Sequence, residues 1–121
     1  MSVLHKKQKV YLAGSIAAGR DFAHAIKLIS DTVEKLGLRV VTKVTTVNTS
    51  KKFTNSSTLK SRKAIVVRDK KWIRDSDFVI QEVSQYSHGV GYEHAYAEAQ
   101  DKAILLLRNK KLEGDKYSAF L

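Results

Sequence analysis

Four short, mainly apolar runs constrain the fold of this chain more than any other feature. Each run is four to six residues long: Val10–Ala13, Leu38–Thr42, Phe78–Val83 and Ala103–Leu107. Runs of this length, bounded by small or polar residues, are typical of buried β-strands. The last run, AILLL, is apolar throughout, so we expect the fourth strand to be fully buried.

The stretches between these runs have helical periodicity. An apolar stripe with spacings of four and three residues predicts an amphipathic helix, formed by Phe22, Ile26, Ile29, Val33 and Leu36. Two more helices are predicted over residues 62–76 and 89–101. Strands alternating with helices indicate an α/β protein. We therefore predict a three-layer sandwich of the Rossmann or flavodoxin-like type, with a small, mostly parallel sheet of four core strands.

The length of 121 residues suits one domain. We assign residues 1–8 to a basic N-terminal arm and residues 9–121 to a single α/β domain. Residues 43–61 are rich in Ser, Thr, Asn and Lys and predict a long polar loop, for which a lid over a ligand is one role. Residues 108–121 contain no clear fifth strand, so we expect one edge or face of the sheet to meet a partner subunit.

Composition excludes several classes of protein. Without Cys, the chain has no disulfide, thiol nucleophile or Cys-based zinc site, and the six-residue spacing of His88 and His94 does not suit a metal, so we expect no metal and no cofactor. The longest apolar run has five residues, against roughly 20 for a membrane-spanning helix. With no secretory signal either, we expect no membrane partner and a cytoplasmic protein, with the nucleus as a second compartment.

Positive charge is concentrated in one part of the chain. The formal net charge is +10, with +12 in residues 1–72 and −2 in residues 73–121. Such a surface attracts phosphate, in nucleic acid or in a small ligand. Basic and aromatic residues do not alternate as in a base-stacking platform, so we expect nucleic acid to be an unlikely partner.

In a parallel α/β sheet, ligands bind beyond the carboxyl ends of the strands. This rule selects Gly14–Arg20 after the first strand, the polar loop after the second, and Ser84–Glu93 after the third. The first segment, GSIAAGR, and the third, SQYSHGVGYE, both lead into a helix start, where backbone N–H groups favour an anion. A steric reason for the glycines remains the alternative at the first turn.

Three side chains near these segments could carry chemistry. Glu93 is expected in the first turn of its helix, although acidic first-turn residues are common. Asp69 lies on the apolar stripe with Ile65 and Trp72, and its neighbours point about 100° away, so we expect no easy ion pair with them. Tyr11, in the first strand, is either a core residue or a buried phenol that needs a partner. Two carboxylates and a phenol beside anion-binding turns suggest chemistry at a glycosidic carbon.

These residues also carry a resemblance to a known family. The segments YLAGSIAAGRD (11–21) and RDKKWIRDSDFVIQEVSQYSHGVGYE (68–93), followed by AILLL, resemble the 2′-deoxynucleoside 5′-phosphate N-hydrolases of the nucleoside 2-deoxyribosyltransferase superfamily. The resemblance covers roughly residues 9–121. It implies hydrolysis of the N-glycosidic bond of a deoxynucleoside 5′-monophosphate, giving free base and 2-deoxyribose 5-phosphate through a covalent glutamyl-deoxyribosyl intermediate.

The resemblance implies a role for each matching residue. Glu93 matches the nucleophile, Asp69 the carboxylate that assists the leaving base, and Tyr11 the phenol that orients the nucleophile. Ser118, in YSAFL, matches a serine that reaches the neighbouring subunit's phosphate site, which implies a homodimer. The other positions matched to substrate binding are Gly14, Ser15, Ile16, Arg20, Ser87 and Gly89.

The sequence also departs from the family pattern. Ala17 replaces the first arginine of GSIRGGR, Tyr86 replaces a proline, and the strand and helix that follow the YSAFL region in the family are absent. Two other functions remain open: a nucleoside 2-deoxyribosyltransferase, and a nucleotide- or nucleic-acid-binding module without activity.

Overall fold

The computed structural model describes residues 7–14, 20–42, 59–85 and 87–110. Within them the elements follow the order β1 (Lys9–Ala13), α1 (Arg20–Lys35), β2 (Arg39–Val40), α3 (Leu59–Asp75), β3 (Phe78–Glu82), α4 (His88–Ala99) and β4 (Ala103–Leu107). The strands form one sheet in the order β2-β1-β3-β4, and every pair is parallel. The α/β prediction is thus confirmed, with an all-parallel sheet.

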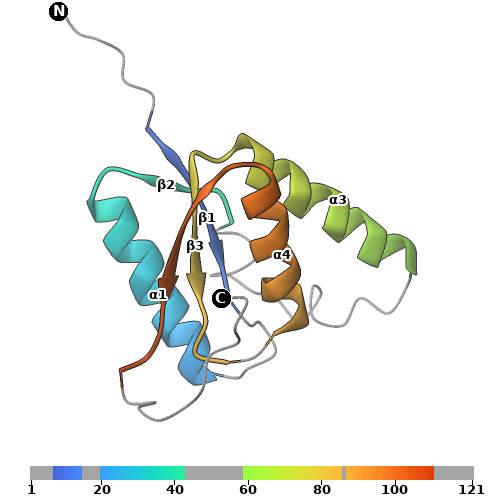
Figure 1. Ribbon diagram of the computed structural model, residues 1–121. Coiled ribbons are helices and arrows are strands. Elements are labelled where there is room, and N and C mark those ends of the chain that lie inside the picture. The colour runs from blue at the N-terminus through green and yellow to red at the C-terminus, as the bar shows by residue number, and fades with distance from the viewer. Residues whose placement is uncertain (1–6, 15–19, 43–58, 86, 111–121) are drawn as a thin grey trace, which may run out of the picture.

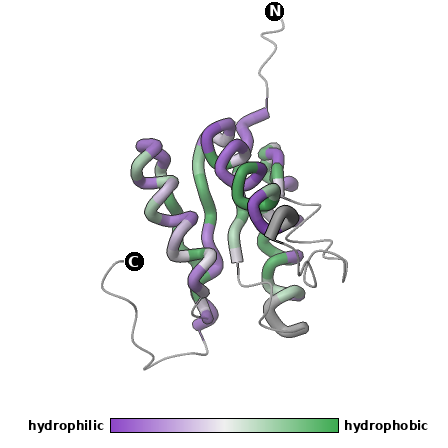
Figure 2. Tube along the Cα trace, turned by 90° about the vertical axis from the view of Figure 1, so that its right-hand side faces the viewer, coloured by the Kyte–Doolittle hydropathy of each residue, from purple (hydrophilic) through white to green (hydrophobic). Residues whose placement is uncertain are grey.

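The two faces of the sheet are covered by different helices (Figure 1). On one face, Val10 and Leu12 of β1 pack with Ile26 and Val33 of α1. On the other, a second core contains Tyr11 and Ala13 of β1, Val79 of β3, Ile73 of α3 and Ala97 of α4. The alternation follows from strand geometry, because successive side chains point to opposite faces. Figure 2 shows these hydrophobic strands between helices that carry hydrophilic residues.

The second strand is shorter than predicted, because the hydroxyl of Thr42 forms the hydrogen bonds to β1 that backbone groups of a longer β2 would form. Pairing of β2 with β1 covers Arg39 and Val40, and the Val41 N–H still donates to the Val10 carbonyl at 3.0 Å. The Thr42 hydroxyl then accepts from the Leu12 N–H at 3.1 Å and donates to the Leu12 carbonyl at 2.8 Å. A side chain thereby ends the ladder that the apolar run predicted to continue to Thr42.

Two predictions about helix α1 and strand β4 are wrong. Leu36 lies beyond the end of α1 and is 74% exposed, whereas Ser30 is fully buried on the inner side of the helix. Strand β4 lies at the sheet edge with Leu105 51% exposed, so the fourth strand is not fully buried. An apolar composition alone does not distinguish an edge strand from a central one.

The third helix begins earlier than predicted. Its first residue is Leu59, so the last three positions of the predicted 43–61 loop belong to α3. The other residues of that loop, 43–58, lie outside the described residues. Strand β3 and helix α4 end one and two residues before their predicted ends, at Glu82 and Ala99.

Candidate active site

Three sequence-predicted residues come together on the face of the sheet covered by α3 and α4. Tyr11 lies in β1, Asp69 in α3 and Glu93 in α4. The Tyr11 hydroxyl donates a hydrogen bond to the Glu93 carboxylate, and the Asp69 charge acts on both groups. The topology brings them together, because β1 lies at the centre of the sheet beside β3, and α3 and α4 pack side by side on one face.

Glu93 has an environment that resists ionisation. Burial and, to a smaller extent, the nearby Asp69 charge raise the pKa of Glu93 to about 8, against the opposing effect of the hydrogen bond from Tyr11. Glu93 is the sixth residue of α4, not part of the first turn as predicted, because the helix begins at His88. The helix dipole therefore acts on it less than expected, since that effect fades beyond the first turn.

Tyr11 stays protonated and serves as a donor. It is 3% exposed, and burial raises the pKa of its phenol, with the charges of Glu93 and Asp69 acting in the same direction. A phenol held in this form can donate to a carboxylate but cannot act as a base near neutral pH. The predicted need of a buried phenol for a partner is met by Glu93.

Asp69 does form an ion pair with its neighbour, so the prediction that Arg68 could not reach it is wrong. Arg68 Nη2 and Nε lie 3.0 and 3.1 Å from the same Oδ1 atom. The Arg68 guanidinium also lies 4.7 Å from the centroid of the Trp72 ring, so this long side chain folds back along the helix surface. Burial raises the pKa of Asp69, and the Arg68 charge opposes that effect.

The structure describes parts of the two strand-to-helix turns at which the sequence predicts anion binding. Ser87 is the N-cap of α4, and its hydroxyl accepts from the Val90 N–H at 3.3 Å. A Cβ added at Gly14 would lie 2.1 Å from Cδ1 of Ile26, so Gly14 has the steric role that the sequence left open. Gly89 is exposed near the start of α4, and Arg20 is the first residue of α1. The predicted residues Ser15, Ile16 and Ser118 lie outside the described residues.

Two polar groups of β3 were not singled out from the sequence. Glu82, at the carboxyl end of β3, is 6% exposed and accepts from the Ser84 N–H and, at 2.9 Å, from the Ser84 hydroxyl. The Ser84 oxygen in turn accepts from the Asn109 N–H at 2.7 Å, which ties the segment after β3 to the end of β4. Gln81, its neighbour, is completely buried and bonded to α4. Polar residues inside an otherwise apolar strand run were the available signal.

Neither a metal centre nor a membrane span is found in the described part of the chain. Among those residues, no three His, Asp or Glu side chains are grouped so as to hold a metal ion. None of the helices there is long and apolar enough to cross a membrane.

The fold and the site together define a class of protein. Two carboxyl groups from helices and a phenol from a strand meet on one face of an all-parallel sheet. These are the groups expected for chemistry at a glycosidic carbon. Residues 10–118 match the family model described as nucleoside 2-deoxyribosyltransferase. The chain belongs to this family.

Individual relatives agree with this assignment. The 5-hydroxymethyl-dUMP N-hydrolase of Danio rerio is 35% identical over 98 residues, covering 81% of this chain and 66% of the relative. That of Tetraodon nigroviridis is 37% identical over 102 residues, covering 82% and 68%. A protein of Syntrophotalea carbinolica, named as a candidate 2′-deoxynucleoside 5′-phosphate N-hydrolase, is 35% identical over 99 residues, covering 82% and 67%. The chain thus spans about two thirds of the length of these relatives.

A solved structure shows the same fold. The 2-deoxyribosyltransferase of Bacillus psychrosaccharolyticus superimposes with a TM-score of 0.68 at 16% identity, over 91% of this chain and 77% of that protein.

Proposed function

We propose that this protein hydrolyses the N-glycosidic bond of 2′-deoxynucleoside 5′-monophosphates, releasing free base and 2-deoxyribose 5-phosphate. The observation that carries the proposal is the convergence of Tyr11, Asp69 and Glu93 on one face of the sheet. The names of the relatives from Danio rerio and Tetraodon nigroviridis, N-hydrolases of a modified deoxyuridine monophosphate, support the substrate class.

Each of the three residues has a defined part in the proposed reaction. The Glu93 carboxylate bonds to C1′ of the sugar while the C1′–N bond breaks and its electron pair leaves with the base. Asp69, as an acid, protonates the departing base. Water then attacks C1′, the ester bond to Glu93 breaks, and the proton of the water returns to Asp69. Tyr11 orients the Glu93 carboxyl group through its hydrogen bond.

A product assay tests this function. Purified protein is incubated with each of the four common deoxynucleoside monophosphates and with 5-hydroxymethyl-dUMP, and free base is measured by chromatography. We expect release from at least one deoxynucleotide, little from the matching ribonucleotide, and a loss of at least about a thousandfold in Glu93→Gln. A folded protein that releases no base from any of them would refute the proposal.

Deoxyribosyl transfer is the second candidate, favoured by the description of the matching family model. The two reactions share the first step and differ in whether water or a second base captures the sugar. Adding an excess of a different free base to the same assay separates them. A new nucleotide or nucleoside would identify a transferase, and 2-deoxyribose 5-phosphate as the sole sugar product would identify a hydrolase.

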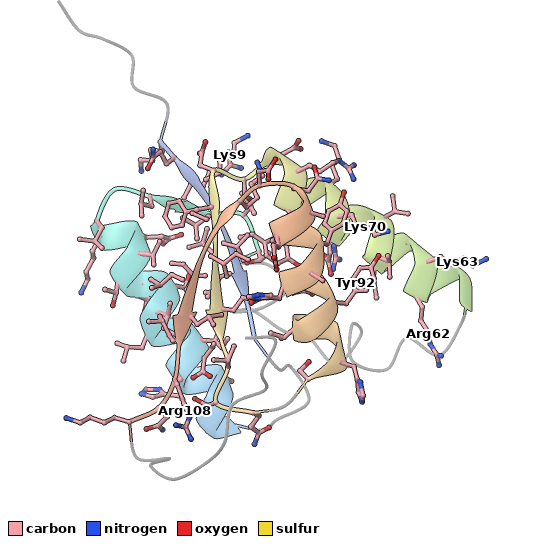
Figure 3. The ribbon with its side chains drawn as sticks, viewed as in Figure 1. Lys9, Arg62, Lys63, Lys70, Tyr92 and Arg108 are labelled. Atoms are coloured by element: carbon pink, nitrogen blue, oxygen red, sulfur yellow. The ribbon has the colours of Figure 1, made fainter. Side chains whose placement is uncertain are left out.

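A binding module without activity is the third candidate, and a tertiary feature favours it. Lys70 Nζ of α3 lies 5.4 Å from the ring centroids of both Tyr92 and Tyr96 of α4, so cations and aromatic rings do adjoin here, although they do not alternate in sequence. Figure 3 shows Lys70 and Tyr92 between these helices, with Arg62 and Lys63 further along α3. Binding to single-stranded DNA that weakens steeply with salt and exceeds binding to mononucleotides would support this function.

We also propose a homodimer in which Ser118 of one subunit completes the site of the other, as the family resemblance implies. Mixing inactive Glu93→Gln with inactive Ser118→Ala subunits tests it, because random exchange would restore about one quarter of the sites. No recovery of activity in mixtures shown to contain heterodimers would refute the shared site.

A further inference from the structure

A buried glutamine connects the central strand β3 to helix α4. Gln81 is completely buried and lies in register with Ala13 of β1 and Leu106 of β4. Its Nε2 donates to the Val90 carbonyl at 3.0 Å, and its Oε1 lies 2.9 Å from Nδ1 of His94. Burying an amide in an apolar strand is costly unless both ends are bonded, and here both are.

The hydrogen bonds determine where the proton of His94 lies. The Val90 carbonyl can only accept, so the amide nitrogen of Gln81 faces it and the amide oxygen faces His94. That oxygen can also only accept, so Nδ1 of His94 must carry a hydrogen. The neutral ring is therefore the Nδ1–H tautomer. Its other nitrogen, Nε2, lies 4.0 Å from the Glu98 carboxylate.

The two bonded residues of α4 flank Glu93. Val90 lies three positions before it and His94 one position after it, so one Gln81 side chain holds the turn that carries the carboxyl group. The apolar contacts of α4 fix the orientation of the helix less well, because its two buried residues, Val90 and Ala97, lie on one stripe. Gly89 and Gly91 also lower the intrinsic stability of this end of the helix.

We propose that Gln81 and His94 are positioning residues, which fix the first turns of α4 on β3 so that Glu93 stays in hydrogen-bonding reach of Tyr11. For catalysis this rests on the proposed hydrolase function. The tautomer and the local stability of α4 do not depend on that function.

Activity assays compare substitutions that remove the hydrogen bonds of Gln81 with one that keeps them. Gln81→Met keeps the length of the side chain and removes both hydrogen bonds, whereas His94→Leu removes the one to His94. His94→Asn places an amide N–H near the position of Nδ1 and should rescue. We expect kcat to fall by about 10- to 100-fold in the first two variants, with KM changed less than about threefold, because misplaced catalytic groups affect the chemical step. His24→Asn, on the exposed side of α1, is the control and should stay near the wild-type value.

Two measurements test the proposal without any turnover. Nitrogen NMR of the His94 ring, at a pH where it is neutral, should show the Nδ1–H tautomer in the wild type and its loss in Gln81→Met. Amide hydrogen exchange at residues 91–94 should accelerate by about tenfold in Gln81→Met and not in His24→Asn. An Nε2–H ring in the wild type, unchanged exchange, or equal damage by His94→Asn and His94→Leu would overturn the proposal. If the wild type releases no base, the hydrolase function fails, while the NMR and exchange data still decide the role of Gln81.

Discussion

Glu93 is held in an environment that opposes the role proposed for it. With a pKa of about 8, this carboxyl group is mostly protonated at neutral pH in the free protein, yet attack on C1′ requires the carboxylate. Because the reaction also needs a proton on Asp69, the two carboxyl groups are competent when they share one proton. We therefore expect kcat/KM to fall as pH rises through about 8, because this parameter reports the ionisation of the free enzyme. Initial rates of base release from pH 5 to 9.5 measure it. A profile that is flat across this range would contradict the assignment.

Tyr11 and Asp69 should change that profile in different ways. Tyr11→Phe removes a hydrogen bond that lowers the pKa of Glu93, so the fall should move to higher pH. Asp69→Asn removes the acid together with a charge that raises the pKa of Glu93, so only the ionisation of Glu93 should remain visible. The rate should then rise with pH, with a midpoint below about 8 and a lower maximum. The same rate measurements serve, and His24→Asn, on the exposed side of α1, is a control that should leave the midpoint unchanged. A fall that does not move in Tyr11→Phe, or that persists in Asp69→Asn, would show that these residues do not act through Glu93.

At the scale of single residues, the sequence identified the reactive groups better than their partners. Asp69 could be predicted as inward-facing from its place on the stripe with Ile65 and Trp72, and it is indeed half-buried. The ion pair of Asp69 with Arg68 could not be predicted, because periodicity gives the direction of each Cβ but not the path of the long Arg68 side chain. For the same reason the contact between Tyr11 and Glu93 required knowledge of how β1 and α4 pack.

At the scale of elements, the short strand β2 allows a test of whether a side chain can replace backbone hydrogen bonds. Thr42→Val keeps the shape and removes both hydrogen bonds to Leu12, which lie in a buried setting. We expect the free energy of unfolding to fall by about 1–3 kcal/mol. Urea denaturation followed by circular dichroism measures it.

Thr32→Val is the matched control for that experiment. Its hydroxyl also donates to a backbone carbonyl, that of Leu28, but on the exposed side of α1. We expect its effect to stay within about 0.5 kcal/mol, as for most surface substitutions. Equal destabilisation by the two variants would mean that the bonds of Thr42 have no special part in ending β2.

The elements themselves were predictable because hydrophobic periodicity determines them locally. The runs at 10–13 and 78–83 and the stripe through Ile26, Ile29 and Val33 correspond to β1, β3 and α1. The ends were less predictable, since they depend on contacts distant in sequence, as with Thr42 and Leu12, thirty residues apart. The exposure of β4 is a property of strand order, which the run AILLL does not encode.

At the scale of the whole molecule, the ionisation of Glu93 that the proposed reaction requires lowers the stability of the fold. In the unfolded chain this group has its ordinary pKa of 4.5, whereas the folded protein raises its pKa to about 8. Between these values the folded state binds a proton that the unfolded state does not, so the contribution of Glu93 to stability decreases as pH rises. The contribution is fully present below the unfolded value and lost through the folded one.

Chemical denaturation at a series of pH values from 5 to 9 tests this opposition. Subtracting the Glu93→Gln curve from the wild-type curve cancels the other titrating groups to a first approximation. The difference should fall with pH by at most about 1.4 kcal/mol per unit, the limit for a single proton, and flatten above about 8. Gln100→Ala, which replaces an exposed residue without a titrating group at the end of the same helix, should give a difference that is flat over this range. If the Glu93 difference were equally flat, its carboxyl group would be ionised as easily in the folded protein as in water. The proposal that folding holds the nucleophile protonated beside Tyr11 and Asp69 would then fail.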